Sequence, residues 1–405
     1  SSDLAVAAEW QAFLTSLEPL CRAARSLPLL ALRPDAGGAL SLGPAAGLAL
    51  LGRLPQLIGL GGAFGSLTRR HLRDPFLIHW VEMLSFLISG LGVEHTSTAA
   101  MATLFGEWFE PHACLDYPIG GSPAVVDALV RGIRRHGGQV RTGATVDQIL
   151  VKGGRAAGVR LSQACGGETL EARRGVICSA SPWDTLRLLP QGAVPERWSR
   201  ARRATPACAS FLHWHLGLRG GAELDDLPIH TVWVGDWQRG IGAERNMVVL
   251  SMPSKLDPSQ APSGHHVLHG YTPANEPWHL WKDLERGTPA YASLKRERCG
   301  VFHQVFDQLL PDWRDRSVIE LQGTPLSHRH WLRVHQGSYG PAWPADQGPF
   351  PGGSTPLPGL VLCGAGVFPG IGVPPVAISG AQAAHRFVSP LAQRHLLESL
   401  DLLPA

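Results

Sequence analysis

The first part of the chain repeats its apolar positions with a helical period. Phe13, Leu17 and Leu20 share one face of a pattern that begins at the capping pair Ser2-Asp3 and runs to about Leu27. The stretch Phe76 to Leu91 is apolar on most sides, which indicates a helix that is buried or lines an apolar cavity. We therefore predict a helical region over residues 1–111.

Over residues 112–190 the period changes from helical to alternating. A turn at Gly120-Gly121 leads into a helix over Ala124–Arg135, which Gly137-Gly138 ends. The apolar stripe of that helix is Val125, Val126, Leu129 and Ile133. The β-rich runs that follow are Gln139–Arg141, Thr145–Val151, Ala156–Ser162, Glu168–Glu171 and Gly175–Cys178. The pattern predicts a helix, a β-meander and a buried strand that leads into the loop Ser179–Pro182.

Residues 191–345 combine regularly spaced strand patterns with one long helix at Ala290–Leu310. The predicted strands are Cys208–Leu218, His230–Asp236, Met247–Met252, His266–Tyr271 and Val318–Gln322. Such a succession is typical of an antiparallel or mixed sheet covered by helices, an α+β arrangement. The Pro- and Gly-rich stretch Pro341–Pro358 is interpreted as a linker.

The segment Leu360–Phe387 reads as a strand, a glycine loop and a helix that begins at Pro374-Pro375. The helix carries a stripe of small residues, namely Ala377, Gly380, Ala381 and Ala384. Free N–H groups are expected at its N-terminus, on Ile371, Gly372, Val373 and Val376. Together with the positive end of the helix they would bind an anionic oxygen or nitrogen, and a reduced flavin offers such atoms.

Composition argues against one class of function and indicates the redox state of the cysteines. The 36 Lys and Arg residues nearly balance 33 Asp and Glu, so the net charge of +3 does not indicate a nucleic-acid-binding protein. The seven cysteines are an odd number without C-x-x-C spacing, which favours reduced thiols.

No signal peptide and no spanning helix is expected, which favours a cytoplasmic or plastid-stromal location. The stretch Leu42–Leu60 comes closest to a membrane segment, but Pro44, Arg53 and Pro55 interrupt it. We interpret it as a core helix, with a peripheral membrane-surface segment as the alternative.

Four motifs follow one another along the chain. They are Tyr117-Pro118-x-Gly120-Gly121-Ser122, the segment Gly143–Ile149 followed by Gly154-Arg155-Ala156-x-Gly158-Val159, the segment Gly323–Arg329, and Cys363-Gly364-x-x-x-Phe368-Pro369-Gly370-x-Gly372-Val373-Pro374. These motifs resemble those of the carotenoid isomerase and phytoene desaturase flavoproteins, and the carotenoid isomerase (prolycopene isomerase) branch is the best match. Each motif alone is moderate evidence, but all four follow in the order of the family over nearly the whole chain.

The resemblance implies a split FAD/NAD(P)-binding domain, Rossmann-like and of the glutathione-reductase type, together with a mixed-sheet and helix substrate domain. Residues 1–111 and 191–345 would form the substrate domain, residues 112–190 and 346–390 the FAD-binding domain, and residues 391–405 a tail. The family's C-terminal signature passes beneath the isoalloxazine, Val146 corresponds to the adenine contact, and Ala180 and Ser181 approach the dinucleotide. The implied FAD contacts are Val146, Ala180, Ser181, Gly364, Ala365, Phe368, Pro369, Gly370, Gly372, Val373 and Pro374.

Two departures from the family pattern affect the cofactor. The sequence lacks the strand and G-x-G-x-x-G turn that would hold the pyrophosphate. Ala365 stands where the family usually has an Asp, and losing such a hydrogen-bonding charge costs about 1.5–3 kcal/mol. We therefore expect the chain as given to bind FAD weakly or not at all, and a longer parent chain to bind it.

Other chemistries find less support in the sequence. His213 and His215 lie at strand spacing and point to one face, but two hydrogen-bonded histidines explain them better than a metal. His265, His266 and His269 lack a neighbouring acidic or cysteine partner, so no metal site is predicted. His328 and His330 are placed at the end of a strand, facing either the flavin or the surface. The sequence contains no G-x-S-x-G elbow, the motif that would indicate a hydrolase, and no catalytic acid or base is assigned.

The function implied by the resemblance is FAD-dependent cis–trans isomerisation or desaturation of a lipophilic polyene such as a carotenoid. The thirteen Trp residues and the apolar helix at Phe76–Leu91 suit an apolar tunnel as well as an ordinary core. The alternative is a truncated or degenerate relative that binds an apolar ligand or a partner without flavin chemistry.

Overall fold

The computed structural model describes residues 2–33, 40–41, 48, 51–110, 116–348 and 350–402. The chain divides into two compact units, each built from separate stretches of sequence. Unit 1 comprises Ser1–Ala113, Gly143–Ala207 and Gly340–Ala405, and unit 2 comprises Cys114–Thr142 and Cys208–Tyr339.

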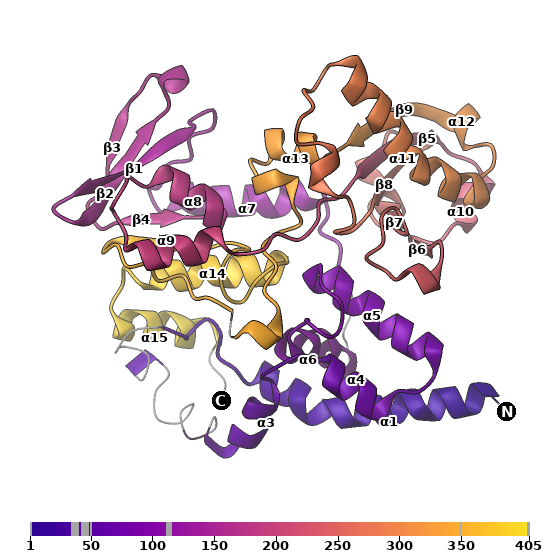
Figure 1. Ribbon diagram of the computed structural model, residues 1–405, viewed down its shortest axis with the longest axis horizontal. Coiled ribbons are helices and arrows are strands. Elements are labelled where there is room, and N and C mark those ends of the chain that lie inside the picture. The colour runs from indigo at the N-terminus through magenta and orange to yellow at the C-terminus, as the bar shows by residue number, and fades with distance from the viewer. Residues whose placement is uncertain are drawn as a thin grey trace. The chain divides into compact units, whose positions relative to one another are not determined.

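The N-terminal stretch of unit 1 is helical, as predicted (Figure 1). Its helices are α1 (Ser2–Arg25), α3 (Leu54–Gly59), α4 (Gly65–His71), α5 (Pro75–Ser89) and α6 (Thr98–Gly106). They enclose the fully buried rings of Phe13, Phe64 and Phe105, whose centroids lie 6.0–6.1 Å apart. Edge-to-face and stacked contacts of this kind add specific geometry to the apolar burial.

Two predictions on these helices need correction. Helix α5 is not buried on every side, because Phe76 is 61% exposed and Ile78 also faces outward, so for this face the alternative that it lines an apolar cavity stays a prediction. The predicted core helix at Leu42–Leu60 lies partly outside the described residues, and α3, which is described, buries none of its side chains. Ile58 is 71% exposed, whereas Leu57 packs on the core of these helices and Leu60 is buried in it, so the core interpretation is wrong only for the outer face of α3.

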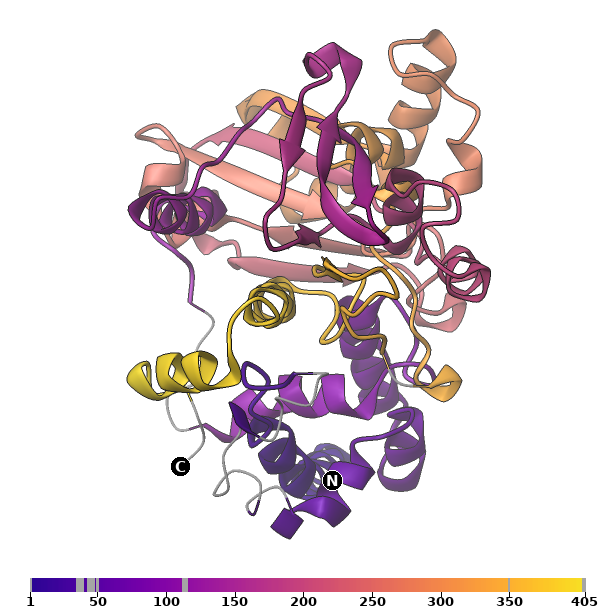
Figure 2. The same ribbon diagram turned by 90° about the vertical axis from the view of Figure 1, so that its left-hand side faces the viewer.

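The predicted β-meander forms in unit 1 as a three-stranded antiparallel sheet of β1 (Val146–Lys152), β2 (Arg155–Leu161) and β3 (Thr169–Glu171) (Figure 2). Gly153 and Gly154 turn between the first two strands with positive φ. The run Gln139–Arg141 forms no strand, so that prediction is wrong.

The other strands of unit 1 pair in parallel, β4 (Val176–Cys178) with β10 (Leu360–Leu362). The remaining helices are α8 (Pro182–Leu188), α9 (Glu196–Arg203), α14 (Val373–His385) and α15 (Pro390–Ser399). Helix α15 lies in the stretch interpreted as a tail. The carbonyl oxygen of Leu30 accepts one hydrogen bond from the Gln393 side chain on α15 and is in hydrogen-bond contact with Nδ1 of His385 on α14. These contacts connect the segment after α1 to both helices.

Unit 2 is an α+β structure around a five-stranded sheet in the order β6-β7-β8-β5-β9, antiparallel throughout. Its strands are β5 (His213–Arg219), β6 (His230–Val234), β7 (Met247–Ser251), β8 (His265–Tyr271) and β9 (Ser317–Gly323). Its helices are α7 (Ser122–Arg135), α10 (Ala222–Asp226), α11 (Pro289–Leu309), α12 (Trp313–Arg316) and α13 (Pro325–Trp331). Both units also contain short 3₁₀ turns. Those of unit 1 are η1 (Glu107–Phe109), η2 (Gln163–Cys165) and η8 (Ala345–Gln347). Those of unit 2 are η3 (Trp237–Arg239), η4 (Pro253–Lys255), η5 (Pro258–Gln260), η6 (Trp278–Leu280) and η7 (His335–Gly337).

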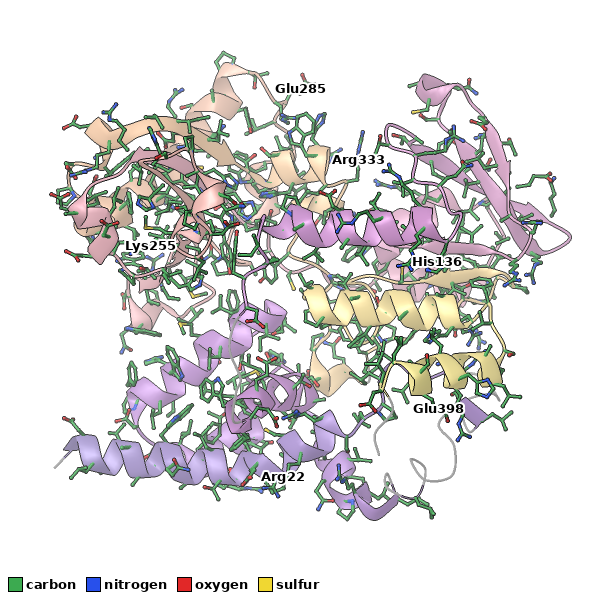
Figure 3. All side chains as sticks on the ribbon, turned by 180° about the vertical axis from the view of Figure 1, so that it is seen from behind. Arg22, His136, Lys255, Glu285, Arg333 and Glu398 are labelled. Atoms are coloured by element: carbon green, nitrogen blue, oxygen red, sulfur yellow. The ribbon has the colours of Figure 1, made fainter. Side chains whose placement is uncertain are left out.

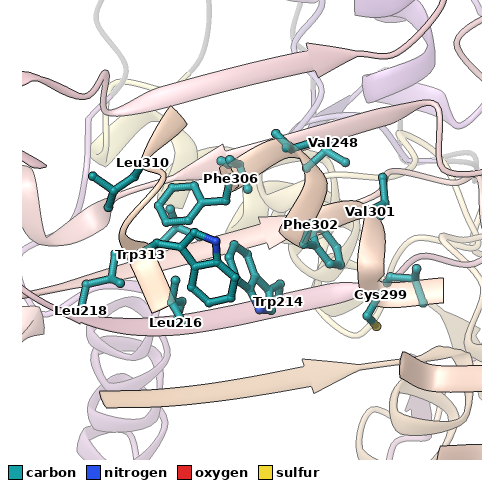
Figure 4. Packing of buried hydrophobic residues seen from close by; sticks show 14 of the residues in the cluster. Trp214, Leu216, Leu218, Val248, Cys299, Val301, Phe302, Phe306, Leu310 and Trp313 are labelled. Atoms are coloured by element: carbon teal, nitrogen blue, oxygen red, sulfur yellow. The ribbon is translucent and has the colours of Figure 1, made fainter. Parts of the chain in front are cut away.

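The core of unit 2 lies between one face of this sheet and α11 (Figure 4). Trp214 on β5 is fully buried, stacks on Phe302 at 5.8 Å and meets Trp313 edge-to-face at 5.3 Å. Its indole N–H donates to Glu320, which satisfies the one polar atom of the ring. Strand alternation therefore sends Trp214, Leu216 and Leu218 to the core and the odd-numbered residues of β5 to the other face.

Charged side chains such as Arg22, Glu285 and Glu398 are exposed, with both signs interspersed (Figure 3). No disulfide joins the cysteines in the described ranges, namely Cys21, Cys165, Cys178, Cys208, Cys299 and Cys363, whereas Cys114 lies outside those ranges. Among the described helices, none is both long and apolar enough to cross a membrane.

Candidate functional site

Two loops meet at the carboxyl ends of the parallel strands β4 and β10. Because the strands run in the same direction, both loops leave the sheet at one edge, which is where α/β sheets bind ligands. A Cβ on Gly364 would lie 3.3 Å from the carbonyl oxygen of Ser179, and one on Gly366 would lie 2.9 Å from Cδ of Pro182. The structure therefore brings the predicted residues Ala180 and Ser181 together with Gly364 and Ala365.

The loop after β10 is fastened to the helix that follows it. The buried hydroxyl of Ser379 on α14 accepts a hydrogen bond from the Gly364 N–H at 2.8 Å and donates to the Val376 carbonyl at 2.7 Å. Gly364 has φ +90°, a conformation that favours glycine. This contact fixes the turn against the first half of α14.

The N-terminus of α14 presents unused donors. Val376 is not one of them, because its N–H donates to the Gly372 carbonyl at 3.0 Å, so that part of the prediction is wrong. For the N–H groups of Ile371, Gly372 and Val373 we find no acceptor among the described residues. Pro374 and Pro375 carry no N–H, so these three donors and the helix dipole make up the polar end of α14.

The remaining predicted contacts surround this terminus. Gly370 and Gly372 have φ of +122° and +114°. Phe368 is half-buried, donates its N–H to the Pro351 carbonyl and lines a cavity of about 270 Å³ beside α14. Pro369 is half-buried, whereas Val373 and Pro374 are exposed.

Val146 and Ser181 have clear structural roles of their own. Val146 is the first residue of β1, half-buried and opposite Leu161, in a strand that packs on α8. The Ser181 hydroxyl caps α8 by accepting from the Asp184 N–H at 3.1 Å.

The outer edge of β4 is open among the described residues. The Val176 N–H and the Cys178 carbonyl bond to the β10 side, so alternation points both backbone polar groups of Ile177 away from β10. By contrast, the far edge of β10 is covered, because the Leu362 N–H donates to Gly353. The Ile177 side chain is 43% exposed.

In unit 2, the glycine turn before α7 is anchored by a buried carboxylate. Asp257 accepts hydrogen bonds from the N–H of Gly120 at 2.7 Å, from the N–H and hydroxyl of Ser259, and from Gln260. These donors lower the pKa of Asp257, the Gly120 N–H most of all. The apolar stripe predicted on α7 is exposed in the structure, with Leu129 at 65%.

The sheet face of unit 2 opposite α11 gathers four histidines, a grouping that the sequence did not reveal. His213 and His215 point to one face, as predicted, and His269 lies directly opposite His215 across the β5–β8 pair. His266 points to the other face and pairs with Ser254. His328 lies on α13, not at a strand end as predicted, and its Nε2 is 3.2 Å from Nδ1 of His213. His330, on the same helix, is exposed.

Burial lowers the pKa of all four imidazoles, which favours their neutral form. Burial, assisted by the neighbouring histidines, lowers the pKa of His213 to about 2. Burial likewise lowers the pKa of His269 and of His328 to about 4, and that of His215 to a smaller extent.

Sequence comparison identifies relatives over most of the chain, although no protein-family model matches it. Prolycopene isomerase 2 of an Oncidium hybrid cultivar is 31% identical over 346 residues, which cover 83% of this chain and 57% of the relative. The chloroplastic prolycopene isomerase of Daucus carota is 28% identical over 344 residues, covering 83% and 54%. The neurosporene-forming phytoene desaturase of Rhodobacter capsulatus is 28% identical over 349 residues, covering 78% and 61%.

The predicted resemblance to carotenoid isomerases and phytoene desaturases is confirmed. The chain spans between 54% and 61% of the length of these three relatives.

Solved structures confirm the predicted α/β and α+β fold class. Wild-type putrescine oxidase bound to putrescine superposes with a TM-score of 0.54 and 14% identity, over 96% of this chain and 75% of that one. An oxidoreductase from Methanosarcina mazei superposes with a TM-score of 0.52 and 19% identity, over 80% and 68%. At these identities the likeness establishes the fold alone.

Proposed function

We propose that this chain belongs to a flavin-dependent enzyme that isomerises or desaturates a long lipophilic polyene, a carotenoid being the representative substrate. The observation that carries the proposal is the N-terminus of α14, where three N–H groups without an acceptor among the described residues lie near the strand-end loops of β4 and β10. The similarity to prolycopene isomerases over 83% of the chain supports the choice of flavin and of polyene.

The residues around α14 suit the ring system of a flavin. The N–H groups of Ile371, Gly372 and Val373 would hydrogen-bond an electron-rich ring edge, and the helix dipole would favour negative charge there. Gly380 has open space where a Cβ would project, so its helix face admits a flat group at close range. When bound, the flavin supplies hydride or electron transfer, and the chain's part is to bind, orient and shield it from water.

The polyene would be held by apolar burial, at about 25 cal/mol for each Å² removed from water. We assign part of this surface to the outward face of α5, where Phe76 and Ile78 are exposed and the Phe76 ring stacks on Trp80 at 6.4 Å. The exposed Leu54 and Ile58 of α3 support peripheral contact with a membrane in which such a substrate dissolves.

We also propose that the dinucleotide site extends beyond the residues given. The open edge of β4 at Ile177 supports a further parallel strand, and a two-stranded parallel sheet is otherwise rare. A glycine turn after that strand would hold the pyrophosphate. Ala365 brings no charged partner to the ring end, so affinity for FAD is expected to depend strongly on that turn.

The test is FAD titration of this chain and of a version extended upstream into any preceding strand and glycine turn, with bound flavin read from its visible absorbance and fluorescence quenching. We expect binding by the extended chain and at least tenfold weaker binding by the shorter one. Gly372→Ala in the extended chain should weaken binding, because φ at that position is +114°. Gly240→Ala, with φ +80° and open space around it, controls for backbone strain alone.

An extended chain that stays colourless with excess FAD would favour the alternative of a non-catalytic relative that binds an apolar ligand. If flavin binds, incubation of the reduced and, separately, of the oxidised holoenzyme with a cis-polyene separates the two reactions. Isomerisation leaves the hydrogen count of the polyene unchanged, whereas desaturation requires oxidised flavin and removes two hydrogens.

A further inference from the structure

Three imidazoles of unit 2 converge on one point of its sheet. His213 and His215 are two residues apart on β5 and therefore share a face, and His269 on β8 is paired directly with His215. Ring centroids lie 4.9 Å apart for His213–His269 and for His215–His269, and 5.9 Å apart for His213–His215. One ligand nitrogen from each ring lies within 4.8 Å of the other two.

We propose that His213, His215 and His269 bind a divalent transition-metal ion, with Zn²⁺ as the reference ion. Zinc bonds to histidine nitrogen at about 2.0–2.1 Å in tetrahedral geometry, which places ligand nitrogens about 3.4 Å apart. Side-chain rotations that bring the nitrogens up to about 1.4 Å closer would complete the triangle while the two strands stay unchanged. Two of the ligands come from one strand and the third from its hydrogen-bonded neighbour, so the backbone already fixes their spacing.

A fourth histidine, His328, supports one of the three proposed ligands. A metal bound at Nε2 of His213 requires the proton on Nδ1, and that N–H faces Nε2 of His328 at 3.2 Å. His328 is 4% exposed, its ring stacks on Phe211 at 3.9 Å, and its Nδ1 has no hydrogen-bond partner among the described atoms. His328 therefore serves as an acceptor that fixes the tautomer and ring plane of His213, as outer-shell partners of metal ligands do.

The fourth coordination position opens toward a cavity. His215 is the exposed member of the triad and lines a cavity of about 440 Å³. Arg286, Tyr291 and Lys295 line the same cavity, which favours water, hydroxide or a carboxylate as the fourth ligand. Three protein ligands and one open position are typical of catalytic zinc sites, whereas structural sites use four protein ligands.

The experiment uses the full chain without a histidine tag, stripped of metal with a chelator. Zn²⁺ and Co²⁺ are titrated by calorimetry, and the visible ligand-field bands of Co²⁺ report tetrahedral coordination. We expect one ion per chain, at least a hundredfold weaker binding for His269→Gln and for His215→Gln, and a 10- to 100-fold loss for His328→Gln. His265→Gln is the matched control, since His265 lies on the same strand and face but outside the triad, and it should bind as the wild type does.

Because His215 is exposed, His215→Gln should retain the wild-type circular dichroism and unfolding curve, so lost binding cannot be attributed to unfolding. The proposal is overturned if the metal-free wild type binds neither ion. It is equally overturned if the triad variants bind as tightly as His265→Gln. None of these outcomes depends on flavin binding, so the experiment tests the metal site independently of the proposed function.

Discussion

The backbone N–H of Gly364 donates to the hydroxyl of Ser379 at 2.8 Å, and that hydroxyl donates onward to the Val376 carbonyl at 2.7 Å. These two hydrogen bonds join the end of strand β10 to helix α14 through groups of the protein alone. The turn is thus preorganised by the protein itself, which reduces the ordering cost of binding a ligand there.

Ser379→Ala should lower the free energy of unfolding by about 1–3 kcal/mol, because the Gly364 N–H would lose its acceptor in a buried place. Ser399→Ala is the control, since Ser399 makes the same kind of helical hydroxyl bond on the exposed end of α15. Its effect should stay within about 0.5 kcal/mol. Chemical denaturation measures both, and equal effects would mean that the Gly364 contact contributes nothing.

Gly158→Ala should disrupt the pairing of β2 with β3. The added Cβ would lie 2.2 Å from the Leu170 carbonyl oxygen, and φ at this residue is +153°. We expect a loss of about 2–4 kcal/mol from crowding and backbone strain together. Gly154→Ala, with φ +71° and open space, should lose only about 1 kcal/mol. Hydrogen exchange at β3 should rise in the first variant alone.

Arg298→Met should lower the free energy of unfolding more than Ser379→Ala, Gly158→Ala or Asp257→Asn. Arg298 donates to both oxygens of Glu276, which is completely buried, and also contacts Glu244 at 2.8 Å. Removing the guanidinium leaves an uncompensated buried carboxylate, at a cost of about 3–5 kcal/mol.

Adding Glu276→Gln to Arg298→Met should recover part of this loss, because the amide oxygen still accepts from the Trp281 indole while the charge is gone. Glu244→Gln, at the half-exposed partner, should cost less than about 1 kcal/mol. A double variant as unstable as Arg298→Met would show that the charge of Glu276 is not the cause.

Asp257→Asn should loosen the turn at Gly120 and make its amide exchange faster. The pKa of Asp257 is lower in the folded chain than the ordinary aspartate value of about 3.9. The unfolded chain therefore binds more protons just below that pH, so this carboxylate's contribution to stability is complete above it and is lost as the pH falls through the folded value. The variant should show a flatter decline of stability with acid than the wild type. An equally steep decline of stability with falling pH in the variant and in the wild type would contradict this assignment.

Elements with a strong local period were predictable from sequence. Helices α1, α5, α7 and α11 and the meander strands appear where periodicity and turn residues placed them. Helices α13 and α15 were missed, yet each begins with a hydroxyl residue followed by proline, at Thr324-Pro325 and Ser389-Pro390. Thr324 and Ser389 cap their helices with their side chains, so that dipeptide was the available signal.

The candidate site was predictable only in part. The strand-loop-helix at Leu360–Phe387 has a local signature, and its meeting with Ala180 and Ser181 followed from the motif order. The histidine cluster had no such signature, because His215 and His269 come together through the register of strands some fifty residues apart. Register between distant strands depends on the packing of the whole sheet, which no local pattern encodes.

The open edge at Ile177 also determines how the chain behaves when it is concentrated. An unpaired N–H and C=O beside an exposed apolar side chain form a template for any extended strand, and β4 has no bulge, proline or lysine to block it. A second copy of the chain can therefore pair with this edge, although an edge of only three residues, Val176–Cys178, is a short template.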